Sequence, residues 1–281
     1  MNAEARISTD FYVRFWGVRG SIAVGSAEVM RYGGNTSCLE IRCGDHVLIF
    51  DSGTGIRALG NLLQRTAPLD ADLFLTHTHY DHVCGLPHFC PFFDPRNRFR
   101  VHAGHVTDGP GIKGVLKQMM TSPLFPVPLE IFQAQLSFED FQQGAVLEPA
   151  PGIRVLTAPL SHPDLATGYR VEFQGKSICY LTDTEHPAEG ICQQLVEFVR
   201  GADIVIYDSM YTPAQYKTRK GWGHSTWEAG VALCNAGAVK TYVVFHHEPE
   251  HDDAAMDAIA VDVDQARPGS IVAREGMLLR P

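Results

Sequence analysis

Residues 76–82 of the chain read Thr76-His77-Thr78-His79-Tyr80-Asp81-His82. An apolar run at 73–75 comes directly before them, so four groups that can ligate a metal gather where a buried strand ends and a loop begins. In an extended segment, residues two apart point to the same side, so His77 and His79 can reach one ion. Asp81 and His82 turn into the next element and can reach a neighbouring ion. The motif therefore predicts a metal site with ligands for two ions.

The composition indicates a globular chain with one large core. It has 281 residues, of which 45% are hydrophobic and 20% are charged. Its 23 Lys and Arg residues against 32 Asp and Glu residues give a formal charge of -9, which is a poor electrostatic match for folded RNA or DNA. We therefore expect a small-molecule substrate and no nucleic-acid partner.

The N-terminus, the apolar runs and the cysteines indicate the cellular compartment. The N-terminus lacks the basic-then-apolar pattern of a signal peptide, and no apolar run of about 18 residues occurs, so we expect no membrane contact. The seven cysteines are odd in number and form no Cys-x-x-Cys pair, which is typical of a reducing compartment. These features predict a cytoplasmic protein.

The N-terminal half has the pattern of strands, a helix and a further strand. Asp51 ends the strand before the helix, where it could orient a ligand imidazole through its second nitrogen or cap the helix, and the sequence leaves both roles open. The expected strands are 11–16, 39–42, 47–50 and 73–76, and the expected helix is 56–64.

Residues 103–150 are expected to leave the core as an inserted, lid-like excursion within a single domain of residues 11–281. The composition there shifts to Pro, Gly and Met, and no sheet periodicity is evident. Segments of this kind often form lids or substrate walls near active sites, although an insertion that covers a sheet edge is the alternative. We expect Met119, Met120 and Phe125 to form an apolar wall or lid over the metal site.

The C-terminal half repeatedly places histidine or acidic residues where a strand ends. Polar groups that converge at one edge of a β-sandwich have the geometry that a binding site needs. The helix expected at 227–236 has Ser225 as its candidate N-cap. The candidates at or near element ends are His162, Asp183, Asp208, His224, His246 and His247.

Taken in order, these motifs resemble the metallo-β-lactamase superfamily. The resemblance implies an α/β fold, namely a four-layered αβ/βα sandwich with a dinuclear metal centre between the two central sheets. It implies that Asp183 bridges the ions and that His246 is a ligand; alignment on Pro249 selects His246, and a slip of one residue would select His247 instead. The implied ligands are His77, His79 and His162 for one ion and Asp81, His82 and His246 for the other.

Within the superfamily, residues 223–226 and 245–249 resemble the phosphodiesterase branch, which includes the tRNA 3′-processing endonucleases of ribonuclease Z type. Residues 15–21 and 32–37 further resemble bacterial phosphoribosyl cyclic phosphate and cyclic nucleotide phosphodiesterases. The resemblance implies that Asp208 pairs with His224. No arm of the kind that grips tRNA in the endonucleases is recognisable in the sequence.

The expected activity is hydrolysis of a phosphodiester bond in a small cyclic phosphate. The nitrogen and oxygen ligands suit two Zn²⁺ ions, with Mn²⁺ or Fe²⁺ as substitutes. Departure of an alkoxide needs a proton, for which His224 held by Asp208 is the candidate donor, so Asp81, His224 and Asp208 are the expected catalytic residues. The alternatives are an RNA 3′-processing endonuclease, a lactone or thioester hydrolase, a diiron redox protein, which His79 argues against, and a degenerate binding module. A homodimer is left open.

Overall fold

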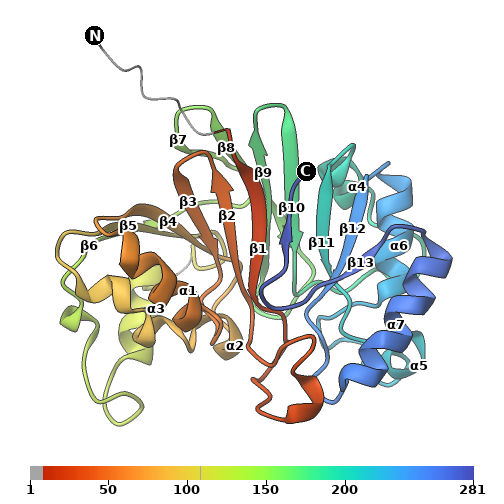
Figure 1. The fold of residues 1–281 in the computed structure, drawn as a ribbon, viewed down its shortest axis with the longest axis horizontal. Coiled ribbons are helices and arrows are strands. Elements are labelled where there is room, and N and C mark those ends of the chain that lie inside the picture. Colours follow the sequence, from red (N-terminus) through yellow and green to blue (C-terminus); the bar gives the residue numbers. More distant parts are fainter. Residues whose placement is uncertain (1–8, 108) are drawn as a thin grey trace.

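The structure, a computed structural model, describes residues 9–107 and 109–281 and has two β-sheets packed face to face (Figure 1). The first sheet has the order β14-β1-β2-β3-β4-β5-β6, with β1 Phe11–Gly17, β2 Cys38–Cys43, β3 His46–Phe50, β4 Asp70–Leu75, β5 Arg98–Ala103, β6 Gln135–Asp140 and β14 Leu278–Leu279. The second has the order β13-β12-β11-β10-β9-β8-β7, with β7 Val146–Ala150, β8 Ile153–Leu160, β9 Ala166–Phe173, β10 Lys176–Leu181, β11 Ile204–Asp208, β12 Thr241–Phe245 and β13 Ile271–Val272.

Helices cover the outer face of each sheet, so the expected α/β fold with four layers is confirmed (Figure 1). The α-helices are α1 Ile56–Leu63, α2 Tyr80–Val83, α3 Gly111–Met119, α4 Gln193–Val199, α5 Pro213–Tyr216, α6 Trp227–Ala236 and α7 Asp253–Ala266. The 3-10 helices are η1 Ala27–Val29, η2 Gln64–Thr66, η3 Leu86–His88, η4 Cys90–Phe93 and η5 Leu129–Ile131. Among the described residues, no helix has the length and apolar character needed to span a membrane.

The alternation of side chains along the strands creates separate apolar cores. In β4, Phe74 packs into the core between the sheets, whereas Leu73 and Leu75 pack into the core beneath α1 and α3. This follows from the two-residue period of a strand, which sends successive side chains to opposite faces. A third core joins the second sheet to α4, α6 and α7. The strand before the histidine motif is therefore held on both faces.

The parallel strands of the two sheets deliver their following residues to one edge of the sandwich. Strands β3 to β6 are parallel in the first sheet, and β10 to β13 are parallel in the second. Ligands commonly bind where the carboxyl ends of parallel strands meet. The histidine motif follows β4, and Asp183 and His246 follow β10 and β12. The topology thus explains why residues far apart in sequence share one site.

The predicted excursion at 103–150 is corrected in two places. It contains β6, which pairs in parallel with β5, and β7, which pairs with β8, so both strands belong to the central sheets. Both are short edge strands whose side chains are exposed or half-buried, and β7 includes Pro149, so neither had the signature of a buried core strand. Met120 is buried in the core beneath α3, so its predicted place in an apolar wall was wrong. The lid role of the remaining segment stays a prediction.

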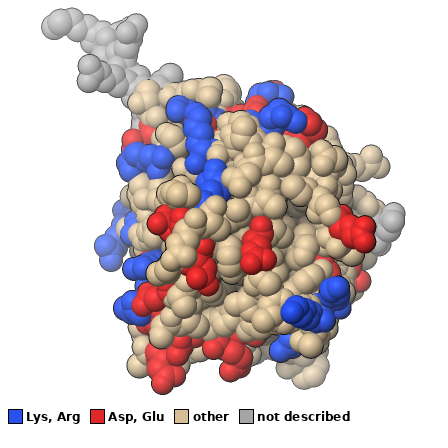
Figure 2. All heavy atoms as spheres, turned by 90° about the vertical axis from the view of Figure 1, so that its right-hand side faces the viewer, with Lys and Arg blue, Asp and Glu red and all other residues tan. Residues whose placement is uncertain are grey.

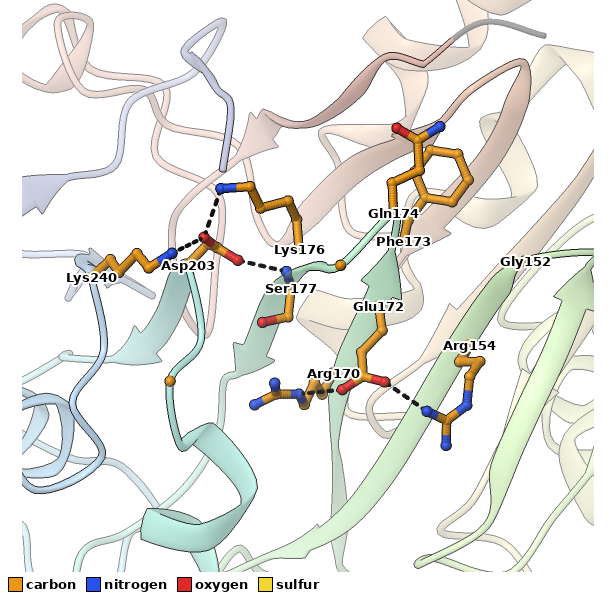
Figure 3. Close-up of a pocket in the computed structure, with 12 residues that line it drawn as sticks. Gly152, Arg154, Arg170, Glu172, Phe173, Gln174, Lys176, Ser177, Asp203 and Lys240 are labelled. Carbon is orange, nitrogen blue, oxygen red and sulfur yellow. Dashed lines mark hydrogen bonds and ion pairs between the residues drawn. The ribbon is translucent and has the colours of Figure 1, made fainter.

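The opposite edge of the second sheet carries a charged hollow of about 390 Å³ (Figure 3). Asp203 accepts hydrogen bonds from Lys176 and Lys240 at 3.3 and 2.7 Å. Glu172 accepts from Arg154 and Arg170 at 2.9 and 3.0 Å. Each of these four basic side chains thus has a carboxylate partner at the amino ends of β10 to β12 or along β8 and β9. We interpret the cluster as a set of contacts that hold these strand ends together.

A buried ion network crosses the first sheet at Asp72 in β4. The Asp72 carboxylate accepts two hydrogen bonds from Arg100 at 2.8 Å and lies 2.7 Å from ring nitrogens of both His46 and His102. Burial alone would raise the pKa of Asp72, but these hydrogen bonds outweigh it and lower the pKa below its ordinary value. The charge of Asp72 is therefore stabilised only in the folded chain.

Replacing Asp72 by Ala should lower the free energy of unfolding by about 1.5–3 kcal/mol, because it removes the carboxylate that the half-buried Arg100 and the buried His102 share. Urea denaturation at neutral pH measures this loss. Asp70→Ala is the control, since Asp70 lies on the same strand and pairs with Arg100 at 2.7 Å but is exposed, and it should cost about 0–1 kcal/mol.

The contribution of Asp72 to the free energy of unfolding should change with pH in a defined direction. The folded-state pKa of Asp72 is lowered, so its contribution is complete above the unfolded pKa of about 3.9 and is lost as the pH falls towards the folded pKa. The stability difference between wild type and Asp72→Ala should therefore shrink below about pH 4. Equal losses from the Asp70 and Asp72 variants at neutral pH would contradict the assignment.

Candidate metal centre

Three groups of potential ligand side chains meet at the carboxyl edge of the sandwich. In each group, one ligand atom per residue lies within 4.8 Å of all the others. The second and third groups share Asp183 and His246, and Asp183 Oδ2 also lies 3.6 Å from His77 and His162 of the first group, so the three form one continuous cluster. They are His77, His79 and His162; Asp81, His82, Asp183 and His246; and Asp183, Asp208, His224 and His246. The structure therefore brings together every ligand and catalytic residue that the sequence analysis named.

Asp183 lies between the first two groups and directs one carboxylate oxygen towards each. Its Oδ2 is 3.6 Å from Nε2 of both His77 and His162. Its Oδ1 is 3.2 Å from His82 Nε2 and 3.4 Å from His246 Nε2. A carboxylate in this position could contact an ion on either side. Its backbone has a positive φ of 57° and its N–H donates to Asp208 at 3.0 Å, which fixes the turn after β10.

In the first group, a backbone carbonyl orients His162. His162 Nδ1 lies 2.8 Å from the carbonyl oxygen of Gly223, and because a carbonyl only accepts, the ring donates from Nδ1. The other nitrogen, Nε2, is then unprotonated in the neutral ring, and it lies 3.0 Å from His79 Nδ1. Burial lowers the pKa of His77 well below its ordinary value, which keeps that ring in the neutral form that ligates metals.

In the second group, Asp51 orients His82. Asp51 Oδ2 lies 2.9 Å from His82 Nδ1 and also accepts from the Tyr180 hydroxyl at 2.8 Å, so the His82 ring donates from Nδ1 and turns Nε2 towards Asp81 and Asp183. The orienting role for Asp51 is thus confirmed over the helix-capping role. Burial would lower the pKa of His82, but the surrounding carboxylates raise it well above its ordinary value.

His246, and not its neighbour, belongs to the second group. His246 Nε2 faces Asp183, and its Nδ1 lies 3.2 Å from the Ser37 hydroxyl. The ring of His247 instead donates from Nε2 to the carbonyl of Ala273 at 2.8 Å. Both residues lie beyond β12, which ends at Phe245, and the positive φ of 64° at His246 turns its ring away from the direction that the strand would give it.

The ligand groups contain buried nitrogens that lack a hydrogen-bond partner among the described residues. They are Nε2 of His77, His82 and His246. An unsatisfied buried polar atom costs about 1–3 kcal/mol, so three in one place indicate a missing partner. Imidazole nitrogens and carboxylate oxygens are ligands that divalent transition ions favour. The residues present therefore fit a pair of divalent metal ions.

Comparison with known proteins gives the family. Residues 46–247 match a family model described as a beta-lactamase superfamily domain. The chain belongs to this superfamily. The resemblance drawn from the motifs is therefore confirmed. The family and the ligand groups together indicate a metal-dependent hydrolase that uses divalent ions.

Among relatives of this superfamily member, ribonuclease Z of Pyrococcus furiosus is 23% identical over 86% of this chain and 89% of the relative. Ribonuclease Z of Bradyrhizobium sp. is 26% identical, with 84% of this chain and 91% of the relative covered. Both names agree with the phosphodiesterase branch to which the motifs point.

Solved structures agree on the fold. The metallo-β-lactamase fold protein YhfI of Bacillus subtilis has a TM-score of 0.73, with 15% identity, 96% of this chain and 98% of that chain covered. A diphosphatase of the PhnP family has a TM-score of 0.71 at 19% identity, covering 97% and 98%. Zn²⁺-bound PqqB of Methylobacterium extorquens has a TM-score of 0.68 at 16% identity, covering 96% and 100%.

His224 lies beside His162 of the first ligand group and His246 of the second, and it contacts Asp208, as the resemblance implied. His224 Nδ1 is 2.8 Å from Asp208 Oδ2, and its ring centroid is 5.1 Å from that of His246 and 5.3 Å from that of His162. Burial would lower the pKa of His224, but the Asp208 carboxylate raises it to about 9.

The N-cap of α6 is Thr226, which accepts from the N–H of Ala229, so the prediction of Ser225 was wrong.

Sequence reasoning missed Glu185, which joins two loops of the site. Its carboxylate accepts hydrogen bonds from the Tyr216 hydroxyl and from the N–H groups of Gly221 and Gly223, at 2.7, 2.9 and 3.1 Å. Its own N–H donates to the carbonyl of Ser161 at 2.7 Å. Because Gly223 in turn holds the His162 ring, Glu185 supports a ligand from outside the cluster. An acid two positions after Asp183 was the only signal in the sequence.

A metal analysis tests the ligand groups. The purified protein should contain two divalent ions per chain, and His246→Ala should retain about one, because His246 belongs only to the groups on one side of Asp183. His105→Ala is the control, since its ring lies 6.5 Å from that of His77 but outside all three groups. Two ions in His246→Ala, or a loss in the His105 variant, would contradict the assignment.

Glu185→Ala should lower metal affinity or turnover by about 10–100-fold, the usual effect of removing a group that orients a ligand. Competition with a chelator measures the affinity, and steady-state kinetics on metal-loaded protein measure the turnover. Glu189→Ala is the matched control, because Glu189 is an exposed acid in the same loop. If both variants behave like wild type, Glu185 has no positioning role.

Proposed function

We propose that this protein is a phosphodiesterase that acts on a small cyclic phosphate, with Zn²⁺ as the bound ion. The observation that carries the proposal is the contact between His224 and Asp208 beside the two ligand groups. A metal pair accounts for attack on phosphorus, but an alkoxide leaving group also needs a proton donor. A histidine held by a carboxylate next to the ligands supports that role.

Different residues of the chain have different roles in the proposed reaction. When bound, a pair of divalent ions lowers the pKa of attacking water and neutralises charge on the phosphoryl oxygens. Asp81 and the other ligands hold the ions, and the N–H of Ser21 donates to Asp81 at 2.8 Å and fixes its orientation. Asp208 occupies Nδ1 of His224, so His224 delivers its proton to the leaving oxygen from Nε2. Asp208 thereby sets the tautomer of the donor.

Charge and the comparisons support a small substrate. The formal charge of -9 opposes the binding of a polyanion. On the face drawn in Figure 2, Lys and Arg side chains are interspersed with Asp and Glu side chains, and the described residues form no continuous basic surface there. The similarity to a diphosphatase of the PhnP family supports a phosphoester substrate. We therefore propose a small phosphodiester as the partner, rather than nucleic acid or a membrane.

A second candidate function is 3′ processing of RNA. The similarity to ribonuclease Z along most of the chain favours it. Such an enzyme would need a basic surface to hold a folded RNA. A lactone or thioester hydrolase is disfavoured because it would leave the His224–Asp208 pair without a role. A screen of metal-loaded protein against cyclic nucleotides, bis-p-nitrophenyl phosphate, a precursor tRNA and a lactone separates these functions.

His224→Ala should lower turnover by about 10²–10⁴-fold on a substrate with an alkoxide leaving group, the usual scale of general acid catalysis. The loss should be much smaller for p-nitrophenolate, which departs without a proton. Steady-state kinetics on both substrates, with metal content measured in parallel, provide the test.

His186→Ala serves as the control for this variant, because His186 contacts Ser225 at 2.8 Å but lies outside the ligand groups. It should leave the ratio of the two rates unchanged. Equal losses on both substrates in His224→Ala, at unchanged metal content, would remove His224 from the acid role and favour the ester hydrolase.

A further inference from the structure

A pocket of about 400 Å³ adjoins the metal centre on the outer side of α2. Thr78 and Tyr80 line one wall, and Val115 and Met119 of α3 line the other together with Phe125. We call it the α2–α3 pocket. Its volume lies in the range of about 300–1,000 Å³ that small-molecule sites occupy. Met119 and Phe125 are thus placed beside the histidine motif, where the sequence analysis expected an apolar wall.

The pocket is continuous with the ligand residues through the backbone of the motif. Thr78 lies between His77 and His79, and Tyr80 follows directly. Helix α2 separates the two sides, since Asp81 and His82 turn inward to the ligand group while Tyr80, with 74% of its surface exposed, turns outward. Thr78 and Tyr80, which line the pocket, flank His79 of the first ligand group, so the pocket is the nearest apolar space that this motif itself borders.

The lining of the α2–α3 pocket suits an uncharged, planar group. Among the residues that line it, none is Lys, Arg, Asp or Glu, so a phosphate has no partner there. The rings of His88 and Phe125 pack edge to face at 6.1 Å, and Tyr80 adds a third ring at the mouth. Stacking on such rings accepts any nucleobase, because every base has a π-face. The His88 ring and the Gln118 amide can hydrogen-bond to a base edge.

We propose that the α2–α3 pocket binds the base of a cyclic nucleotide whose phosphate lies at the metal centre. This rests on the proposed phosphodiesterase function and narrows its substrate class. A phosphoribosyl cyclic phosphate without a base would leave the apolar walls of Met119 and Phe125 in contact with water. A cyclic nucleotide covers them, so the pocket favours a substrate that carries a base.

The test compares adenosine 3′,5′-cyclic phosphate with a ribose cyclic phosphate that lacks the base. Val115→Phe fills the pocket and should lower kcat/KM on the nucleotide by about tenfold or more, the scale of losing a hydrophobic subsite, while the base-free substrate is unaffected. Phe125→Ala, which removes a stacking ring, should raise KM for the nucleotide alone. Lys117→Ala, on the exposed side of α3, is the control and should change neither substrate.

The outcomes distinguish a failure of the base-site proposal from a failure of the proposed phosphodiesterase function. Equal losses on both substrates in Val115→Phe, or no loss on either, would overturn the pocket assignment and leave the phosphodiesterase function standing. If wild type cleaves no phosphodiester, the proposed function fails. Calorimetric titration with adenosine then tests the pocket alone: binding that Val115→Phe abolishes supports the base site, and no binding to wild type overturns it.

The pocket could also contact a second copy of the chain, and sedimentation of the same variants tests this. A wild-type dimer that Val115→Phe converts to monomer would assign the pocket to a subunit contact and overturn the base site. If the oligomeric state is the same in all variants, a loss of activity on the nucleotide alone cannot come from a change in assembly, and it then supports the base site.

Discussion

The site depends on the position of Asp183 between the histidines of the first two ligand groups, and the chain leaves β10 in an unfavourable backbone conformation to place it there. Asp51, Asp183 and His246 each follow a strand and have positive φ values of 60°, 57° and 64°. For a residue with a side chain, this left-handed conformation costs on the order of 1 kcal/mol or more. It turns each side chain from the strand direction into the space between the sheets. Such strain at three ligand-related positions is typical of a functional site.

The rigid core between the sheets holds this strained edge in place. Tyr180 belongs to the second sheet, packs against Phe50 of the first at 6.1 Å and donates its hydroxyl to Asp51. Asp51 in turn orients His82, so a contact between the sheets sets the direction of a ligand. Because interiors are packed as densely as crystals, a change in the spacing of the sheets would displace ligands from both. The fold and the site are thus one mechanical unit.

The sequence predicted what is local and missed what depends on long-range contacts. The His77 to His82 motif could be recognised because its ligands lie within six positions, and the helix expected at 227–236 coincides with α6. The edge strands β6 and β7 were missed, since both are short, neither has a buried side chain, and β7 contains a proline. Glu185 was missed because the partners of its carboxylate lie more than 30 positions away in the sequence. The role of Asp51 stayed open until the fold placed His82 beside it.

Asp208 joins the acid and the metal ligands into one unit. Its Oδ2 receives the His224 ring and the N–H of Asp183, while Oδ1 receives the N–H of Ser225 and that of Met210. A carboxylate is needed here because only an ionised acid accepts all four donors. Loss of Asp208 would release the His224 ring and the backbone of Asp183 together, so its substitution cannot separate the roles proposed for these two residues. The hydrogen bond to the backbone N–H of Asp183 comes from Asp208 and not from His224, so substitution of His224, with metal content measured in parallel, is the more direct test of the proposed proton transfer.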